Sequence, residues 1–361
     1  MHEAMEGIVV SGIQQLGIGV KNVQEAWTWY RKHLGMDIKV FEESATASLM
    51  LPYTGGLPRD RHAVLALNMN GGGGFEIWQY TDRVPQPPAF DPELGDLGIF
   101  AAKIKTRDAH KTHERFVKEN LNVSTLLTDP DGRSFFFVTD PYKNIFQVIE
   151  SENWFGNLKE KTGSVYGVLI GVTEMERSIN FYTEILGYDQ VVFDQKGIFA
   201  DFAHLNGGSS SFRRVLLRHS KPRKGAFGRL LGDSEIELVQ VEGKASRKIF
   251  EDRFWGDLGF IHLCYDINGM EALNSACAER GFPFTVDSFA HHDGNSFDMG
   301  EAAGHFSYIE DPDGTLIEFV ETHKLPLVKK LGLYLNLRKR NPNKHLPNWM
   351  LKSLSLSRVK D

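Results

Sequence analysis

Four acidic or amide residues stand between apolar neighbours in separate segments of this chain of 361 residues. A carboxylate on the inner face of a sheet costs several kcal/mol unless it is paired or binds a cation. A single glutamate of this kind is more often solvent-facing on a half-exposed strand, but its recurrence at similar positions favours a metal site. The four residues are Glu76, Gln147, Glu237 and Glu318.

A strand is expected before each of these residues in the sequence. One position in each of these strands is expected to face the same cavity as the acidic or amide residue that follows it. These positions are occupied by Gln15, Ala101, Gly167 and His262. Only the amide and the imidazole among them can bind a metal. A lone histidine in an apolar strand is usually a core residue, but the register of His262 with the glutamate positions favours a ligand.

An internal repeat positions these residues. Trp29-Tyr30 with Gly35 recurs as Phe181-Tyr182 with Gly187, at a separation of 152 residues. The segments that contain Glu76 and Gln147 recur 161 and 171 residues later. The repeat predicts two similar modules, because it extends over most of the chain.

The repeat also sets the expected domain boundaries. We expect a first module at 8–153, a second module at 164–322 and a basic C-terminal extension at 323–361. Residues 159–163 form a short polar linker between the modules. A length of 361 residues agrees with two domains of ordinary size.

Each module divides into two units with the order β-α-β-β-β. In the first unit, a strand at 13–20 precedes a helix that begins after Asn22 and ends at Gly35, two residues with good capping chemistry. Three more strands are expected at 37–42, 63–69 and 74–80. The predicted fold class is α+β, with four such units building curved mixed sheets around a cavity.

The glycine cluster Gly71–Gly74 resembles a phosphate-binding loop in composition only. No Gly-Lys-Ser/Thr follows, and a strand rather than a helix comes next. The segment Asn70-Gly71-Gly72-Gly73 is therefore expected to be a hairpin turn.

Composition narrows the class of protein. A net charge of −6 and a pI near 6.1 argue against nucleic acid as a partner. Cys264 and Cys277 have no metal-type spacing and fit a reducing, cytoplasmic location. No signal peptide is recognised, and no apolar run is long enough for an integral membrane segment.

The extension 323–361 has a different composition, with ten Lys or Arg residues and one acidic residue, Asp361. It also contains many leucines, which argues against simple disorder. We expect it to pack on the acidic body or on a second copy in a homodimer. A contact with an acidic partner or membrane surface is the alternative.

These features together resemble the vicinal oxygen chelate superfamily, which includes glyoxalase I, extradiol dioxygenases and bleomycin-resistance proteins. The resemblance rests on the paired β-α-β-β-β units, the aromatic-Tyr helix ends, Asp311-Pro312-Asp313-Gly314 before Leu316-Ile317-Glu318, and the strand-borne ligands. It covers roughly residues 10–322 and is specific for the fold.

The pairing of units decides which metal site exists. If each repeat closed its own site, both ligand sets would be incomplete. The resemblance to glyoxalase I implies instead that the first unit pairs with the fourth, which gives the set Gln15, Glu76, His262 and Glu318. The remaining positions, Ala101, Gln147, Gly167 and Glu237, would then form a decayed site.

The resemblance implies a metal-dependent lyase or isomerase acting on a small-molecule substrate. One divalent ion, which is zinc, nickel, cobalt or manganese, would bind two vicinal oxygens and stabilise an enediolate. Glu318 is the first choice of catalytic base and Glu76 the second.

Three departures argue against glutathione as the substrate. In glyoxalase I, an arginine four residues after the first ligand and an asparagine four residues after the first glutamate hold glutathione. Gly19 and Tyr80 stand at those positions here. Leu316 also replaces the aromatic residue expected two positions before the last ligand.

Two other functions remain open. Extradiol dioxygenases hold iron with two histidines and a glutamate in the second repeat, and Gly167 stands in place of one histidine. A non-catalytic binding protein of the bleomycin-resistance kind would instead have a metal-free apolar groove. Its lining would come from Trp27, Trp78, Phe254 and Trp255, which are otherwise expected in the core.

A second metal site is conceivable at His291, His292 and His305, in or beside a loop rich in Gly and Asp. A solvated loop is the simpler expectation for these histidines.

Overall fold

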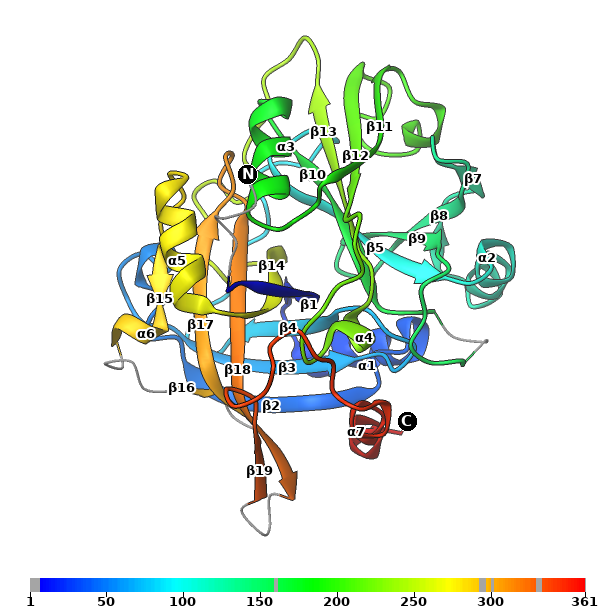
Figure 1. Ribbon diagram of the computed structural model, residues 1–361. Coiled ribbons are helices and arrows are strands. Elements are labelled where there is room, and N and C mark those ends of the chain that lie inside the picture. Colours follow the sequence, from blue (N-terminus) through cyan, green and yellow to red (C-terminus); the bar gives the residue numbers. More distant parts are fainter. Residues whose placement is uncertain (1–6, 159–161, 292–296, 300–301, 329–332, 361) are drawn as a thin grey trace.

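Ten strands from the two ends of the chain form one strongly curved mixed sheet (Figure 1). They are β1 (Val9–Gly19), β2 (Ile38–Thr46), β3 (Asp60–Leu67), β4 (Gly74–Tyr80), β14 (Gly259–Asn268), β15 (Val286–Asp287), β16 (Phe297–Met299), β17 (Ala302–Glu310), β18 (Leu316–Val328) and β19 (Leu333–Asn336). The order is β15-β17-β18-β14-β1-β4-β3-β2, with β16 beside β17 and β19 beside β18. This computed structural model describes residues 7–158, 162–291, 297–299, 302–328 and 333–360.

The middle of the chain forms the second sheet. Its strands are β5 (Gly98–Thr106), β6 (Asn122–Val123), β7 (Leu127–Thr128), β8 (Ser134–Thr139), β9 (Ile145–Glu150), β10 (Val165–Gly171), β11 (Gln190–Gly197), β12 (Phe212–Arg218) and β13 (Glu235–Val241). The order is β11-β12-β13-β10-β5-β9-β8-β6, with β7 beside β8.

The first unit therefore shares a sheet with the fourth, and the second shares one with the third. The antiparallel pair β1–β14 joins the outer units, and β5–β10 joins the inner ones. Within each unit, the first and last strands are parallel neighbours, as in β1–β4 and β14–β18. The pairing of the first unit with the fourth, which the resemblance implied, is confirmed. The alternative, in which each repeat closes its own site, does not match this arrangement of strands.

Helices cover the outer parts of the sheets. They are α1 (Val23–Leu34), α2 (Ala109–Lys118), α3 (Met175–Glu184), α4 (Gly228–Leu231), α5 (Met270–Glu279), α6 (Ser288–His291) and α7 (Asn348–Lys352), with short 3₁₀ turns η2 (Leu51–Tyr53), η3 (Ala200–Phe202) and η5 (Ser353–Ser357). The expected caps of α1 are confirmed. The Asn22 side chain accepts hydrogen bonds from the backbone N–H groups of Gln24 and Glu25, and Gly35 ends the helix with a φ of 67°.

The glycine turn joins the two repeats. It lies between β3 and β4 as expected, but the N–H of Gly72 donates to Leu230 O and the N–H of Gly73 donates to Val165 O. A Cβ atom on Gly72 would lie 2.6 Å from Val165 O. Glycine is needed here because two backbones approach closely.

Two buried tyrosine–aspartate hydrogen bonds explain why the helix-end and Asp-Pro motifs repeat together. The Tyr30 hydroxyl donates to Asp140 Oδ2 at 2.6 Å, and the Tyr182 hydroxyl donates to Asp311 Oδ2 at 2.9 Å. Each bond links two consecutive units whose strands belong to different sheets. The sheets are thus held together by side chains as well as by their shared apolar core, in which Phe146 contacts both Phe75 and Phe260.

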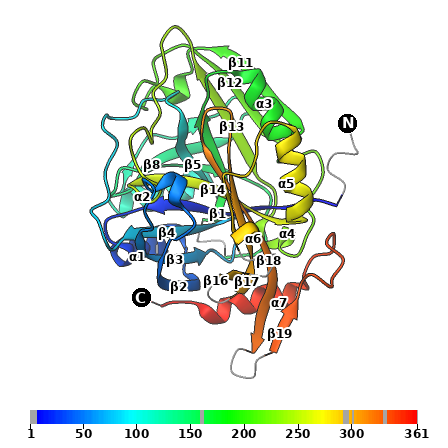
Figure 2. The ribbon, with the colours of Figure 1, turned by 90° about the vertical axis from the view of Figure 1, so that its left-hand side faces the viewer.

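The C-terminal extension packs along β2 (Figure 2). Leu346 and Leu351 are buried in a hydrophobic cluster with Ile38 of β2. Arg358 forms an ion pair with Asp37, and the N–H of Val359 donates to Asp37 O. Packing of the extension on the body is confirmed, whereas contact with a second copy or an acidic surface stays a prediction. The strand β18 itself continues past residue 322 to Val328.

Two other expectations concern the cellular location of the protein. Among the described residues, no helix is long and apolar enough to cross a membrane. Cys264 and Cys277 are free and buried. The cytoplasmic location stays a prediction.

We predict that Tyr30→Phe lowers the free energy of unfolding by about 1–3 kcal/mol, because it removes a hydrogen bond to the buried Asp140 carboxylate. Urea unfolding measures this loss. Tyr334→Phe is the matched control, since Tyr334 is 52% exposed and should change stability by under about 0.5 kcal/mol. Equal losses in the two variants would contradict a structural role for the tyrosine–aspartate bond.

Candidate metal centre

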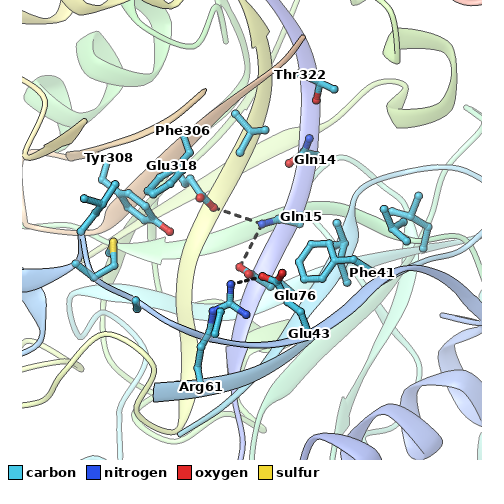
Figure 3. Close-up of a pocket in the computed structure, with 18 of the residues that line it drawn as sticks. Gln14, Gln15, Phe41, Glu43, Arg61, Glu76, Phe306, Tyr308, Glu318 and Thr322 are labelled. Atoms are coloured by element: carbon cyan, nitrogen blue, oxygen red, sulfur yellow. Dashed lines mark hydrogen bonds and ion pairs between the residues drawn. The ribbon is translucent and has the colours of Figure 1, made fainter. Parts of the chain in front are cut away.

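The four predicted ligands converge in the first sheet. Gln15 Nε2 lies 3.2 Å from Glu76 Oε2 and 3.4 Å from Glu318 Oε2 (Figure 3). His262 Nε2 lies 3.4 Å and 3.0 Å from the same two carboxylate oxygens. The ligand atoms of Glu76, His262 and Glu318 all lie within 4.8 Å of one another. All four side chains are buried, so few waters can stabilise the two negative charges.

Strand register brings these side chains together. Gly17 of β1 is paired with Glu76 of β4 on one side and with His262 of β14 on the other. A Cβ atom on Gly17 would lie 2.4 Å from the His262 ring, so the glycine leaves room for the imidazole. The β1–β14 register shifts on both sides of this point, and such bulges re-aim side chains.

The electrostatics of the centre favour a cation. Burial lowers the pKa of His262, but the nearby Glu318 and Glu76 carboxylates outweigh burial and raise it to about 9. The imidazole is therefore protonated at neutral pH when no other cation is present. The Trp255 ring, nearly parallel to His262 with ring centres 6.1 Å apart, shields it from solvent.

Tyr308 is a site residue that the sequence analysis missed. It lies opposite Glu318 in the β17–β18 pair, and its ring centre is 5.5 Å from that of His262. Burial and the carboxylates of Glu318 and Glu76 hold the pKa of its hydroxyl well above the usual value. The Asp311–Gly314 turn was the available signal, because a short hairpin at that turn places Tyr308 across from Glu318.

A cavity of about 320 Å³ adjoins the centre. Gln15, Glu76, Tyr308 and Glu318 line its polar end, together with an ion pair between Arg61 and Glu43 (Figure 3). Mostly apolar side chains from several elements line the rest, together with Gln14 and the hydroxyl groups of Thr46, Ser48 and Thr322. Its size fits a small organic ligand.

The corresponding position in the second sheet holds a lysine. Lys103 Nζ lies 2.6 Å from Glu235 Oε1 and 2.5 Å from Glu237 Oε2, and it is fully buried. Burial alone would raise the pKa of Glu237, but the charges of Arg214 and Lys103 lower it below its usual range. Lys103 and Arg214, which the sequence analysis missed, thus neutralise the carboxylates of the position that lacks a complete ligand set.

The other predicted residues of that position lie apart from any ligand set. Ala101 and Gly167 lie in β5 and β10, and a Cβ on Gly167 would lie 2.0 Å from Glu235 O. The Gln147 amide is buried and has no hydrogen-bond partner among the described residues.

A second cluster of ligand-type residues lies elsewhere on β17 and β18. His305, Glu321 and His323 offer ligand atoms within 4.8 Å of one another. The sequence analysis named His305 but missed Glu321 and His323. His292 and the side chain of His291 lie outside the described residues.

The four aromatic residues that would line the groove of a non-catalytic binding protein do not lie together around one groove. Trp27 and Trp78 are buried in two different hydrophobic clusters, and Phe254 packs partly buried against the second one. Trp255 is the one member of this set that lines the cavity.

Comparison with known proteins agrees with this architecture. The family described as the Glyoxalase/Bleomycin resistance protein/Dioxygenase superfamily matches residues 12–148 and 166–319. The chain belongs to this superfamily. No curated protein matches it in sequence.

Two solved structures show the same fold. Glyoxalase I from Zea mays has 14% sequence identity and a TM-score of 0.53, with 96% of each chain covered. A candidate dioxygenase from Bacillus subtilis subsp. subtilis str. 168 has 14% identity and a TM-score of 0.55, with 98% of this chain and 97% of that chain covered. At such identity, the likeness extends to the fold and not to the reaction.

We predict that Lys103→Met lowers the free energy of unfolding by about 3 kcal/mol, because it removes the buried cation that contacts both Glu235 and Glu237. The loss is at the low end for a broken buried ion pair, since arginines still contact each carboxylate. Lys111→Met is the control: Lys111 also pairs with an acid, Asp108, but its side chain is 83% exposed, and its loss should cost under about 0.5 kcal/mol. Chemical denaturation of both variants measures the difference. A small effect at Lys103 would show that its charge is not needed.

The raised pKa of His262 predicts a pH-dependent stability of the metal-free protein. The ordinary pKa is 6.5 and the folded value is about 9. The stabilisation is therefore complete below pH 6.5 and is lost as the pH rises through 9, a change of ~3 kcal/mol.

His262→Asn removes this titration. Unfolding of both proteins in excess EDTA should show a stability difference that is largest near pH 6 and smaller by ~3 kcal/mol near pH 10. A difference that does not vary with pH would rule out a protonated His262 between the carboxylates.

Proposed function

We propose that the protein is a metal-dependent lyase or isomerase of the glyoxalase type, with Gln15, Glu76, His262 and Glu318 holding one divalent ion. The observation that carries this proposal is the convergence of two buried carboxylates, an imidazole and an amide from four adjacent strands. A mixed oxygen and nitrogen set of this kind suits zinc, nickel, cobalt or manganese.

The unbound geometry fits such an ion. His262 Nε2 is at ion-pairing distance from both carboxylates, yet it makes no regular hydrogen bond to any described residue. The Gln15 amide turns its nitrogen toward the same two oxygens. Gln15, Glu76, His262 and Glu318 would hold a divalent ion in place of the imidazole proton, and its charge would neutralise the two carboxylates more fully than the present contacts do.

The reaction would use the cavity beside the ligands. The ion would act as a Lewis acid on two vicinal oxygens of the substrate and stabilise the charge of an enediolate. Glu318 would move the substrate proton at a carboxylate oxygen, and its position in the cavity lining beside the other proposed ligands supports this role. Glu76 is the alternative base, and the buried Tyr308 hydroxyl would orient the Glu318 carboxylate from the opposite strand.

One observation opposes glutathione as the substrate, and another opposes an extradiol reaction. Tyr80 is buried with its hydroxyl donating to Trp255 O, so it does not offer the amide expected at that position. Gly167 lies in the second sheet, so a histidine at that position would not face the four ligands. Bound iron with oxygen uptake on catechols would nevertheless favour the dioxygenase.

We predict that the purified protein contains about one equivalent of divalent metal at this centre, and that Gln15→Ala and His262→Ala each reduce its affinity by 10-fold or more. Elemental analysis after dialysis and metal titration by calorimetry measure this. Gln147→Ala is the matched control, because Gln147 stands at the position of the repeat that corresponds to Glu318, with no ligand set around it.

Retention of metal by both Gln15→Ala and His262→Ala would overturn the proposed ligand set. A wild-type protein that binds no divalent metal under any condition would favour the non-catalytic binding protein. Loss of metal in Gln147→Ala alone would place the centre in the second sheet.

A further inference from the structure

The cavity beside the metal centre is polar at one end and apolar along its length. Its polar end consists of ligand residues with Tyr308, and Gln14 and the Arg61–Glu43 ion pair add further polar groups. The remaining polar lining residues carry hydroxyl groups only: Thr46, Ser48 and Thr322. The apolar wall includes Val40, Leu67, Leu230, Leu231, Leu325 and Leu354. Charged and amide groups of the lining therefore face only part of a ligand, and the rest of the ligand meets mostly apolar side chains with a few hydroxyl groups.

The C-terminal extension supplies part of this apolar wall. Leu325 lies in β18 beyond the glyoxalase-like module, and Leu354 lies in η5 near the C-terminus. The extension is held in place by the ion pair between Arg358 and Asp37 and by the hydrogen bond from Val359 N–H to Asp37 O. Leu354 belongs to the same hydrophobic cluster as Ile38, so the wall is part of the folded body.

The cavity lining extends along β18. Glu318 and Leu325, seven residues apart in this strand, both line the cavity. At ~3.4 Å per residue, this separation is roughly 24 Å along the strand. The volume of about 320 Å³ is about twice that of an engineered apolar cavity that holds benzene. A long, narrow ligand fits this shape better than a compact one.

The charges of the cavity lining disfavour substrates that carry charged groups along their body. Arg61 is the single cationic side chain among the described lining residues, and it pairs with Glu43 near the polar end. A peptide-like body with carboxylates would leave those charges unpaired against leucine and valine. The body of the substrate is therefore uncharged.

We propose that the substrate is an amphipathic molecule with vicinal oxygens at one end and an extended, uncharged apolar body, such as an alkyl or aryl-alkyl chain, and that the C-terminal extension selects for that body. The position of the oxygens rests on the proposed metal function. The selection by the apolar wall rests on the cavity alone.

The test uses alkyl hydroxamates of increasing chain length as probes, because a hydroxamate binds a metal through two adjacent oxygens. Calorimetry with the full-length, metal-loaded protein should show affinity rising about fourfold for each added methylene until the wall is filled, the equivalent of ~0.8 kcal/mol per methylene. Matching primary amides, which carry the same chains without the chelating group, form the second arm.

Three variants at two positions of one short 3₁₀ turn test the role of the extension, with Leu356→Arg as the control. Leu354→Arg should abolish the dependence on chain length while leaving acetohydroxamate binding within about twofold, because the charge lies on the wall and away from the metal. Leu356→Arg should behave like the wild type, since Leu356 is 89% exposed. Leu354→Trp, which adds bulk without charge, should weaken the long probes selectively.

The outcomes separate the two proposals. Affinity that does not change with chain length, or an equal loss in Leu354→Arg and Leu356→Arg, would overturn the apolar substrate. Hydroxamates that bind no better than the matching amides, with the chain-length dependence intact, would instead overturn the metal function and leave the apolar selection standing.

Discussion

The antiparallel pairing of β1 with β14 is the interaction on which the candidate site depends. It joins the first and fourth units of the chain and sets Gly17 opposite His262, so that the imidazole reaches the space between Glu76 and Glu318. Neither repeat contains a complete ligand set of its own. A site built across two units ties metal binding to correct assembly of the whole fold, because the ligands meet only after strands far apart in sequence have paired.

The two sheets neutralise buried carboxylates in different ways. In the second sheet, the Lys103 ammonium group contacts Glu235 and Glu237 and is held there by the fold. In the first sheet, the two carboxylates raise the pKa of His262, so its imidazole carries the neutralising proton, and the centre adjoins a cavity. Under the proposed function, a metal ion would take the place of that proton. The Lys103 ammonium group belongs to the chain and forms a permanent ion pair. A bound metal ion, as proposed for the first sheet, would instead have coordination positions left for a substrate. The same repeated architecture can thus support stability in one half and chemistry in the other.

The C-terminal extension connects the site to the rest of the chain. Its composition predicted packing on the acidic body or on a second copy, with an acidic partner or membrane surface as the alternative. Within the described residues, several of its leucines pack in the same cluster as Ile38 of β2, and Leu325 and Leu354 line the cavity. Lysine and arginine side chains are mostly on the outside of such a segment, so net charge is a poor guide to what its apolar face does. If the proposed selection holds, a change in this terminal segment would alter ligand binding while leaving Gln15, Glu76, His262 and Glu318 in place.

The order of elements, the caps of α1, the glycine turn and the repeated positions of Gln15, Glu76, His262 and Glu318 could be predicted from the sequence, because spacing and apolar patterning are properties of contiguous residues. The pairing of outer units came from a family resemblance, since hydrogen bonds between strands leave no local signal. Tertiary structure alone decided that Lys103 reaches Glu235 and Glu237, that Tyr308 stands beside His262 and that Leu354 lines the cavity. These contacts depend on strand twist and on neighbours tens to hundreds of residues away, which no short stretch of sequence specifies.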